Sequence, residues 1–200
     1  MYTILKSEKY EVSVLQSKFI SYLIHIENLA DFDYFYKNLK KEHKKAKHIC
    51  YAYILNNTYK YSDDGEPSST AGLPIYNILK GNELKNVALF VVRYFGGTLL
   101  GSGRLLRTYS LAAKEVVNLA KKVKLSTFKF VEVSIDYQSF DSFKNYLNIN
   151  NLIINKTLFN DKIFIEFRSP LDFNENELET LFYPSLKIKN SYIKEIIMED

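Results

Sequence analysis

The sequence confines glycine to about one fifth of its length. All seven glycines of the 200-residue chain lie between Gly65 and Gly103, and none occurs in the last 97 residues. Glycine adopts positive φ angles, and allows two backbone segments to approach closely, at less cost than any other residue. Glycines that served only ordinary turns would be scattered along the chain. We therefore expect the working surface of the protein within residues 63–109.

An acidic loop, residues 62–74, opens this region. It places three carboxylates within four positions, and like charges this close repel unless a cation or backbone N–H groups compensate them. One candidate partner is a divalent metal held by oxygens, and another is the guanidinium of Arg93, Arg104 or Arg107. The simpler interpretation is that Asp63 or Asp64 caps a turn and pairs with an arginine. The residues of interest in this loop are Asp63, Asp64, Glu66 and Thr70.

A second string, residues 91–109, is predicted to run from a strand through a glycine loop, residues 96–103, into a helix. The unpaired N–H groups and the positive dipole end at such a helix start suit a bound phosphate. Nucleotide hydrolysis is not supported, because no Gly-Lys-Ser/Thr closes the loop and Leu106 stands where a dinucleotide motif needs a small residue. The alternative is a tight turn that only lets the helix pack on the strand. The candidate anion-binding residues are Arg93, Gly96, Gly97, Gly101, Gly103, Arg104 and Arg107.

Histidine, cysteine and aromatic residues near these strings are candidates for supporting roles. His48 and Cys50 are two apart on a predicted strand and share a face, which would allow a nucleophile and its base. The more common roles are a small core cysteine and a histidine that hydrogen-bonds the acidic loop. Tyr94, Phe95 and Tyr109 could stack on bases. Because the chain has 16 tyrosines and 14 phenylalanines, core packing is the expected role of any one ring.

Composition sets the class of protein. With 46% hydrophobic and 25% charged residues the chain is typical of an ordinary globular protein. Cys50 is the only cysteine, so we expect no internal disulfide and no cysteine-based zinc site. Lys6, Glu8 and Lys9 interrupt the apolar run that a signal peptide needs, and no stretch of about 18 apolar residues occurs. We expect a cytoplasmic protein with no membrane partner, no cofactor and no bound metal.

Positive charge is concentrated in one segment. The net charge of +4 is by itself too small to indicate a polyanionic partner. Residues 37–47, however, contain six lysines and a single acid, Glu42. This segment is either a cationic patch for nucleic acid or a solvated helix face.

Hydrophobic periodicity predicts the elements of the first part of the chain. Alternating apolar residues in the first 27 positions indicate two or three strands. The spacing further along indicates amphipathic helices, a hairpin and a buried strand. These elements are a helix at residues 29–47, hairpin strands at 49–55 and 58–62, a helix at 71–80 capped by Gly81, a strand at 87–95 and a helix at 104–123.

The second part repeats a smaller pattern after a lysine-rich join at residues 121–126. Its order, strand-helix-strand-strand-helix-strand, is that of a ferredoxin-like fold. Asp172 and Glu175 are expected to cap the second helix, and Pro184 prevents that helix from continuing. The other predicted elements are a strand at residues 128–136, a helix at 138–150, hairpin strands at 152–159 and 162–168, and a last strand at 186–197.

The motifs of both strings resemble those of the YigZ/IMPACT family. The matching segments are Asp63-Asp64-Gly65-Glu66-Pro67, Thr70-Ala71-Gly72, Arg93-Tyr94-Phe95-Gly96-Gly97 and Leu100-Gly101, preceded by His43, Ala46, His48, Cys50 and Ala52. Two positions depart from the family pattern, because Ser69 and Arg104 stand where the family usually has glycine.

The resemblance implies an α+β protein with two domains. Residues 1–124 would form an α/β sandwich of the ribosomal protein S-five second-domain type, and residues 127–200 a ferredoxin-like βαββαβ domain. It also implies a role in translation, since eukaryotic IMPACT proteins restrain the kinase that senses uncharged tRNA.

Three functional hypotheses follow, and the first two need the acidic loop and the glycine loop to fold against each other. The leading one is a non-enzymatic regulatory factor that docks RNA, the ribosome or another part of the translation machinery through the glycine loop, the arginines and the lysine-rich segment. The competing one is a metal-assisted enzyme that acts on a phosphorylated small molecule or peptide, with the acidic carboxylates as ligands or general base. The third is protein–protein docking through the C-terminal sheet.

Overall fold

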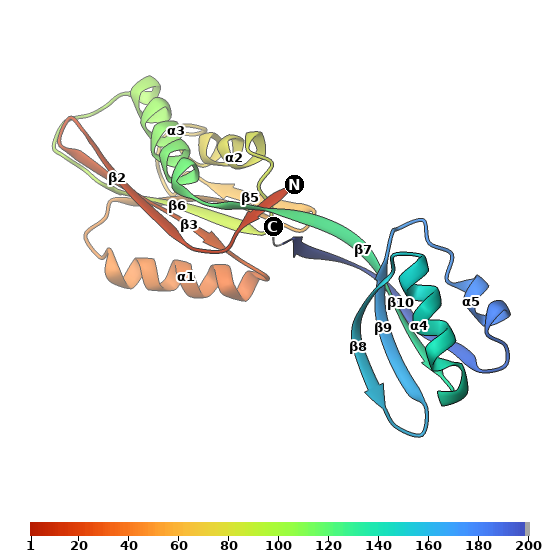
Figure 1. Ribbon diagram of the computed structural model, residues 1–200. Coiled ribbons are helices and arrows are strands. Elements are labelled where there is room, and N and C mark those ends of the chain that lie inside the picture. Colours follow the sequence, from red (N-terminus) through yellow and green to blue (C-terminus); the bar gives the residue numbers. More distant parts are fainter. Residues whose placement is uncertain (199–200) are drawn as a thin grey trace. The chain divides into compact units, whose positions relative to one another are not determined.

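The computed structural model describes residues 1–198 and divides them into two compact units, residues 1–124 and 125–198 (Figure 1). The domain predicted at residues 127–200 therefore has its last two positions outside the described residues. That each unit folds as an independent domain stays a prediction.

A five-stranded antiparallel sheet forms the centre of the first unit. Its spatial order is β2-β3-β6-β4-β5, and the short strand β1 (Tyr2–Ile4) lies outside it. The strands of this sheet are β2 (Glu8–Val14), β3 (Ser17–His25), β4 (His48–Leu55), β5 (Thr58–Ser62) and β6 (Val87–Tyr94). The predicted N-terminal strands and the hairpin at residues 49–62 are confirmed.

Helices cover both faces of this sheet. Helix α1 (Leu29–Glu42) packs on one face, and α2 (Gly72–Gly81) and α3 (Ser102–Leu119) pack on the other (Figure 1). Strand β6 is buried on both sides, because Leu89 and Val91 point to the α2–α3 side whereas Phe90 and Val92 point to the α1 side. This arrangement confirms the predicted α/β sandwich.

Helix α1 is shorter than predicted. Its start agrees with the sequence, since Asn28 and Asp31 form a reciprocal capping box. The helix ends at Glu42 and not near residue 47, because His43 turns inward and is hydrogen-bonded to the hydroxyls of Tyr22 and Tyr94, each at 2.8 Å. Hydrophobic periodicity alone could not show that His43 ends the helix, because a buried residue at this spacing also fits one more helical turn.

The ends of α2 and α3 also differ from the prediction. Asn82, not Gly81, is the C-terminal cap of α2, and its side-chain amide donates to the carbonyl of Ile78 at 2.9 Å. Helix α3 begins two residues earlier than expected, because Gly101 takes a φ of 74° and serves as its N-cap. It ends at Leu119, so the predicted span of residues 104–123 was displaced toward the C-terminus.

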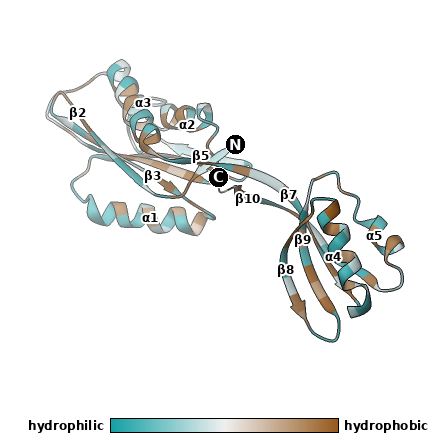
Figure 2. Cartoon of the chain, viewed as in Figure 1, coloured by the Kyte–Doolittle hydropathy of each residue, from teal (hydrophilic) through white to brown (hydrophobic). Residues whose placement is uncertain are grey.

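The second unit has the strand order β10-β7-β9-β8, with both helices on one face of the sheet (Figure 1). This is the order of a βαββαβ ferredoxin-like fold, as predicted. Hydrophobic residues recur along β9 (Figure 2), which alternates buried and partly exposed positions. The elements are β7 (Lys122–Ile135), α4 (Phe140–Ile149), β8 (Ile153–Phe159), β9 (Ile163–Ser169), α5 (Asn176–Leu181) and β10 (Leu186–Met198).

The lysine-rich join at residues 121–126 contains the division between the two units, which falls after Lys124. The strand predicted at residues 128–136 begins earlier than expected, because β7 starts at Lys122 and its residues 122–124 pair with β1. Asp172 does not cap α5; Glu175 holds the N-cap position, and its carboxylate accepts from Lys129 at 2.9 Å.

The pH dependence of stability should depend on His43. Burial lowers the pKa of His43, the Glu42 carboxylate raises it in part, and Lys9 and Lys18 lower it further. As the pH falls through about 6.5, the ordinary histidine pKa, the unfolded chain gains a proton that the folded chain does not, so stability is lost until the pH passes the folded pKa. In urea titrations at about pH 7.5 and about pH 5.5, we expect His43→Gln to lose less unfolding free energy than the wild type. Equal losses in the two proteins would contradict this.

Candidate functional site

Asp63 organises the acidic loop through backbone hydrogen bonds. Its carboxylate accepts from the N–H groups of Ser69 at 2.9 Å, Ala71 at 2.9 Å and Gly72 at 2.8 Å. The last two N–H groups belong to the start of α2, where an anion is favoured by the helix dipole. Backbone donors therefore compensate the charge of Asp63.

Asp64 ties the acidic loop to the beginning of β4. Its carboxylate accepts from the N–H of Ile49 at 2.6 Å, and its carbonyl oxygen accepts from Nδ1 of His48 at 2.7 Å. The proposed histidine contact with the acidic loop is thus confirmed. Neither aspartate pairs with an arginine, so that part of the prediction was wrong.

Glu66 is the carboxylate that pairs with an arginine. Its side chain is 3% exposed, and Oε1 accepts from Nη1 of Arg93 at 2.6 Å and from the hydroxyl of Tyr109 at 2.8 Å. Nε2 of His48 lies 3.9 Å from the same oxygen. Strand β6, helix α3 and the acidic loop therefore meet at one buried oxygen atom.

Arg93 is buried, and only part of its hydrogen-bonding capacity is used. Its guanidinium lies 5.5 Å from the ring centre of Phe19 and 5.7 Å from that of Phe95. Its Nε has no hydrogen-bond partner among the described residues. A buried donor left unpaired is destabilising, so a bound acceptor would be favoured here.

Cys50 has the surroundings of a core residue. Its thiol lies 3.0 Å from the carbonyl oxygen of Asp63 and 3.4 Å from the hydroxyl of Tyr109, and burial raises its pKa. A thiol held protonated is a poor nucleophile. His48 is hydrogen-bonded to Asp64 instead, so the structure does not pair the histidine with the cysteine.

The glycines of the glycine loop have different roles. Gly96 lies against the turn between β2 and β3, where a Cβ would overlap the backbone of Gln16 and Ser17. Gly97 and Gly101 have positive φ angles of 86° and 74°. Gly103 belongs to the first turn of α3 and has an ordinary φ.

The start of α3 is open to an anion. Gly101, its N-cap, provides no side-chain hydrogen bond, so the first N–H groups of the helix have no capping partner. Arg104 and Arg107 are exposed on the first two turns, and within residues 1–198 neither guanidinium makes an ion pair or hydrogen bond. Both remain available to a ligand, and neither is the partner of the acidic loop.

A cleft of about 490 Å³ joins these features. Both the acidic loop and the glycine loop contribute to its lining, as the sequence led us to expect. The lining residues are Lys47, His48, Glu66, Pro67, Arg93, Phe95, Leu99, Leu100, Gly101, Ser102 and Leu105. Leu99 carried no signal in the sequence, although an apolar residue that is 85% exposed between glycines suits a ligand contact.

Several predicted residues lie away from this cleft. Helix α1, which carries most of residues 37–47, covers the opposite face of the sheet from α3 (Figure 1), and of its lysine-rich segment only Lys47 lines the cleft. Tyr94 is bonded to His43 on the α1 side. Thr70 donates to the carbonyl of Pro67 at 2.6 Å and stabilises the acidic loop.

The acidic carboxylates do not converge on a common point. Asp63 and Asp64 are directed to different backbone segments, and Glu66 faces Arg93. Across residues 1–198, no group of three or more histidine, cysteine, aspartate or glutamate side chains is placed to hold a metal ion. In the same range, no helix has the length and apolar character needed to cross a membrane.

Residues 15–117 match the Impact N-terminal domain family. The chain belongs to the IMPACT family. YvyE of Bacillus subtilis, a member of that family, is 29% identical over 197 residues, which are 97% of this chain and 90% of that protein. YigZ of Escherichia coli, also a member, is 36% identical over 101 residues, or 48% of this chain and 50% of that protein.

Another family member, from Haemophilus influenzae, is 38% identical over 128 residues, which are 60% of this chain and 62% of that protein. A crystal structure of a hypothetical protein superposes with a TM-score of 0.67 at 22% identity, over 94% of this chain and 95% of that one. That likeness shows a shared fold.

Replacing Glu66 by glutamine should destabilise this IMPACT family member, because Arg93 would become a buried charge without a counter-ion. Removing one partner of a buried pair costs about 3–5 kcal/mol, and we expect a loss of that size in the unfolding free energy measured with urea. The double variant Glu66→Gln/Arg93→Met removes both charges and should recover part of the loss. If the losses of unfolding free energy in Glu66→Gln and in Arg93→Met simply add in the double variant, the two side chains are not coupled.

Gly96→Ala should also destabilise the fold, because the backbone of Gln16 and Ser17 cannot move aside as a flexible side chain could. Overpacking of this kind costs about 1–3 kcal/mol. Gly81→Ala is the matched control, since no heavy atom lies within 4 Å of its added Cβ, and helix propensity predicts a gain of about 0.5–1 kcal/mol. Thermal melts would compare the melting temperatures of both variants with that of the wild type. Equal stability of Gly96→Ala and the wild type would refute the predicted overlap.

Proposed function

We propose that this IMPACT family member is a translation-associated regulatory factor that binds the phosphate backbone of RNA, on its own or within the translation machinery. The observation that carries the proposal is the uncapped start of α3, which lines a cleft built from both family motifs together with Arg93. Arg104 and Arg107 are exposed on the first two turns of the same helix. Membership in the IMPACT family supports the link to translation, because eukaryotic IMPACT proteins restrain the kinase that senses uncharged tRNA.

The electrostatics of the site favour an anion such as phosphate over a cationic ligand. The first N–H groups of α3 carry the positive end of the helix dipole. Arg104 and Arg107 add two exposed charges on the same turns, while Glu66 is neutralised by Arg93. Lys47 contributes a further cation at the cleft.

The surface proposed for binding is smaller than the sequence suggested. It comprises Arg93, Arg104, Arg107 and the glycine loop, and of the lysine-rich segment it includes only Lys47. The lysines of α1 lie on the other face of the sheet and are left out. Asp63 and Asp64 act as supports, because their carboxylates already accept backbone hydrogen bonds.

Salt-dependent binding tests the proposal. Removing both exposed charges with Arg104→Gln/Arg107→Gln should weaken binding to a labelled RNA, and should reduce the slope of log K against log salt by about 0.7–0.9 per arginine. Lys114→Gln is the control, since Lys114 is exposed farther along the same helix. Fluorescence anisotropy at several salt concentrations would give both quantities.

Two results would overturn the proposal. One is the absence of binding of the wild-type protein to RNA and to ribosomes at low salt. The other is a double arginine variant whose affinity and salt slope match those of Lys114→Gln.

A further inference from the structure

The cleft beside α3 has the features of a site for a single unpaired nucleotide. We infer that one nucleotide of a single-stranded RNA segment enters it, with its base against Phe95 and Leu99 and its phosphate at the start of α3 near Arg93. This inference rests on the proposed function and narrows it, because it distinguishes single-stranded from double-stranded RNA.

The size of the cleft supports one small unit as the occupant. Its volume of about 490 Å³ falls within the roughly 300–1,000 Å³ of ordinary small-molecule sites. A double helix is too wide to enter such a space and could only lie across its mouth. Proteins that read unpaired RNA take bases that are turned out from the strand, which are units of this size.

The apolar side of the cleft suits a base. Phe95 is 46% exposed and Leu99 is 85% exposed, and both line the cleft. The ring of Phe95 lies 5.7 Å from the guanidinium of Arg93. An exposed aromatic ring beside a cation is the usual platform for an unpaired base.

The polar side of the cleft suits the phosphate of the same nucleotide. Gly101 leaves the first N–H groups of α3 uncapped, and Ser102 at this helix start lines the cleft. A second observation points to the same ligand, because the side chain of Arg93 is 5% exposed and its Nε lacks a partner among the described residues. Nε is itself covered, so a phosphate oxygen would pair with it only after the Arg93 side chain shifts.

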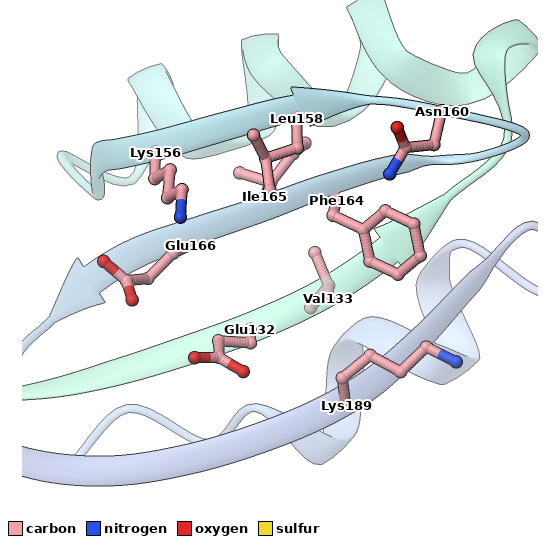
Figure 3. Close-up of a pocket in the computed structure, with 9 residues that line it drawn as sticks. All are labelled: Glu132, Val133, Lys156, Leu158, Asn160, Phe164, Ile165, Glu166 and Lys189. Atoms are coloured by element: carbon pink, nitrogen blue, oxygen red, sulfur yellow. The ribbon is translucent and has the colours of Figure 1, made fainter.

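The pocket on the open face of the second unit's sheet does not share this character. It has a volume of about 400 Å³ and includes Lys156 and Lys189, but Glu132 and Glu166 lie directly opposite each other on β7 and β9 (Figure 3). Two neighbouring carboxylates repel a phosphate. The second unit therefore provides a place for a control substitution.

Phe95→Leu tests the base contact, because leucine keeps the apolar volume and removes the aromatic face. We expect the affinity for a labelled single-stranded oligouridylate to fall by roughly 5- to 100-fold, the loss that follows from one base stack. Binding of a blunt-ended RNA duplex should be unchanged. Phe159→Leu, at a phenylalanine 60% exposed on β8, is the matched control and should bind both RNAs like the wild type.

Ser102→Asp tests the phosphate contact. A carboxylate in the first turn of α3 interacts favourably with the positive end of the helix dipole. The melting temperature of Ser102→Asp should therefore be unchanged or higher. The same charge should repel the phosphate and weaken oligouridylate binding at least fivefold relative to the neutral variant Ser102→Asn. A weaker binder that still melts at or above the wild-type temperature cannot be explained by unfolding.

The outcomes separate this inference from the proposed function. If Phe95→Leu or Ser102→Asp binds the oligouridylate like its control while Arg104→Gln/Arg107→Gln still weakens RNA binding, the nucleotide site is refuted and the phosphate-docking role stands. If the wild type prefers the blunt-ended duplex, the nucleotide site is also refuted. If the wild type binds neither RNA at low salt, both proposals fail.

Discussion

The ion pair between Glu66 and Arg93 connects the parts of the first unit that make up the site. Arg93 is on the central strand β6, Glu66 is in the acidic loop, and Tyr109 donates to the same carboxylate from α3. Charges this deeply buried are stable only when they are paired and hydrogen-bonded. The position of the acidic loop therefore depends on β6 and α3, and the glycine loop that joins these two elements lines the cleft together with the acidic loop.

The hydrogen bonds around this pair give the two aspartates a supporting role. Asp63 holds the start of α2, and Asp64 holds the start of β4. Both the φ of 44° at Asp64 and the φ of 62° at Ser69 lie in the left-handed region, where residues other than glycine are strained. A glycine at position 69 would adopt this geometry without strain, and the hydrogen bond from the N–H of Ser69 to Asp63 keeps the chain in it here.

The fold could be predicted where local sequence patterns determine an element. The prediction was less accurate where a contact with a residue distant in the sequence determines the end of an element. Alternation and turn residues were sufficient for the hairpin of β4 and β5, and strand-helix order for the ferredoxin-like unit. The end of α1 depends on His43 meeting Tyr22 and Tyr94, which are 21 and 51 residues away in the sequence. The start of β7 depends on pairing with β1, more than 100 residues earlier.

The site was predicted to the level of its segments, but not to the level of its contacts. Three carboxylates and three arginines were recognised, yet their spacing does not say which of them form a pair. Glu66 was selected because it faces β6, whereas Asp63 and Asp64 face backbone donors. The structural reason for Gly96, contact with the turn at Gln16, likewise joins residues 80 apart and leaves no local trace.

A backbone amide chemical-shift titration with a short single-stranded oligouridylate tests most directly whether the acidic loop and the glycine loop form one anion-binding surface. We expect the signals of Glu66, Ser102 and Gly103 to shift together with a single apparent Kd, while those of the α1 lysines stay in place. Shifts confined to α1 or to the second unit, with the signals of the cleft unchanged, would contradict the shared surface.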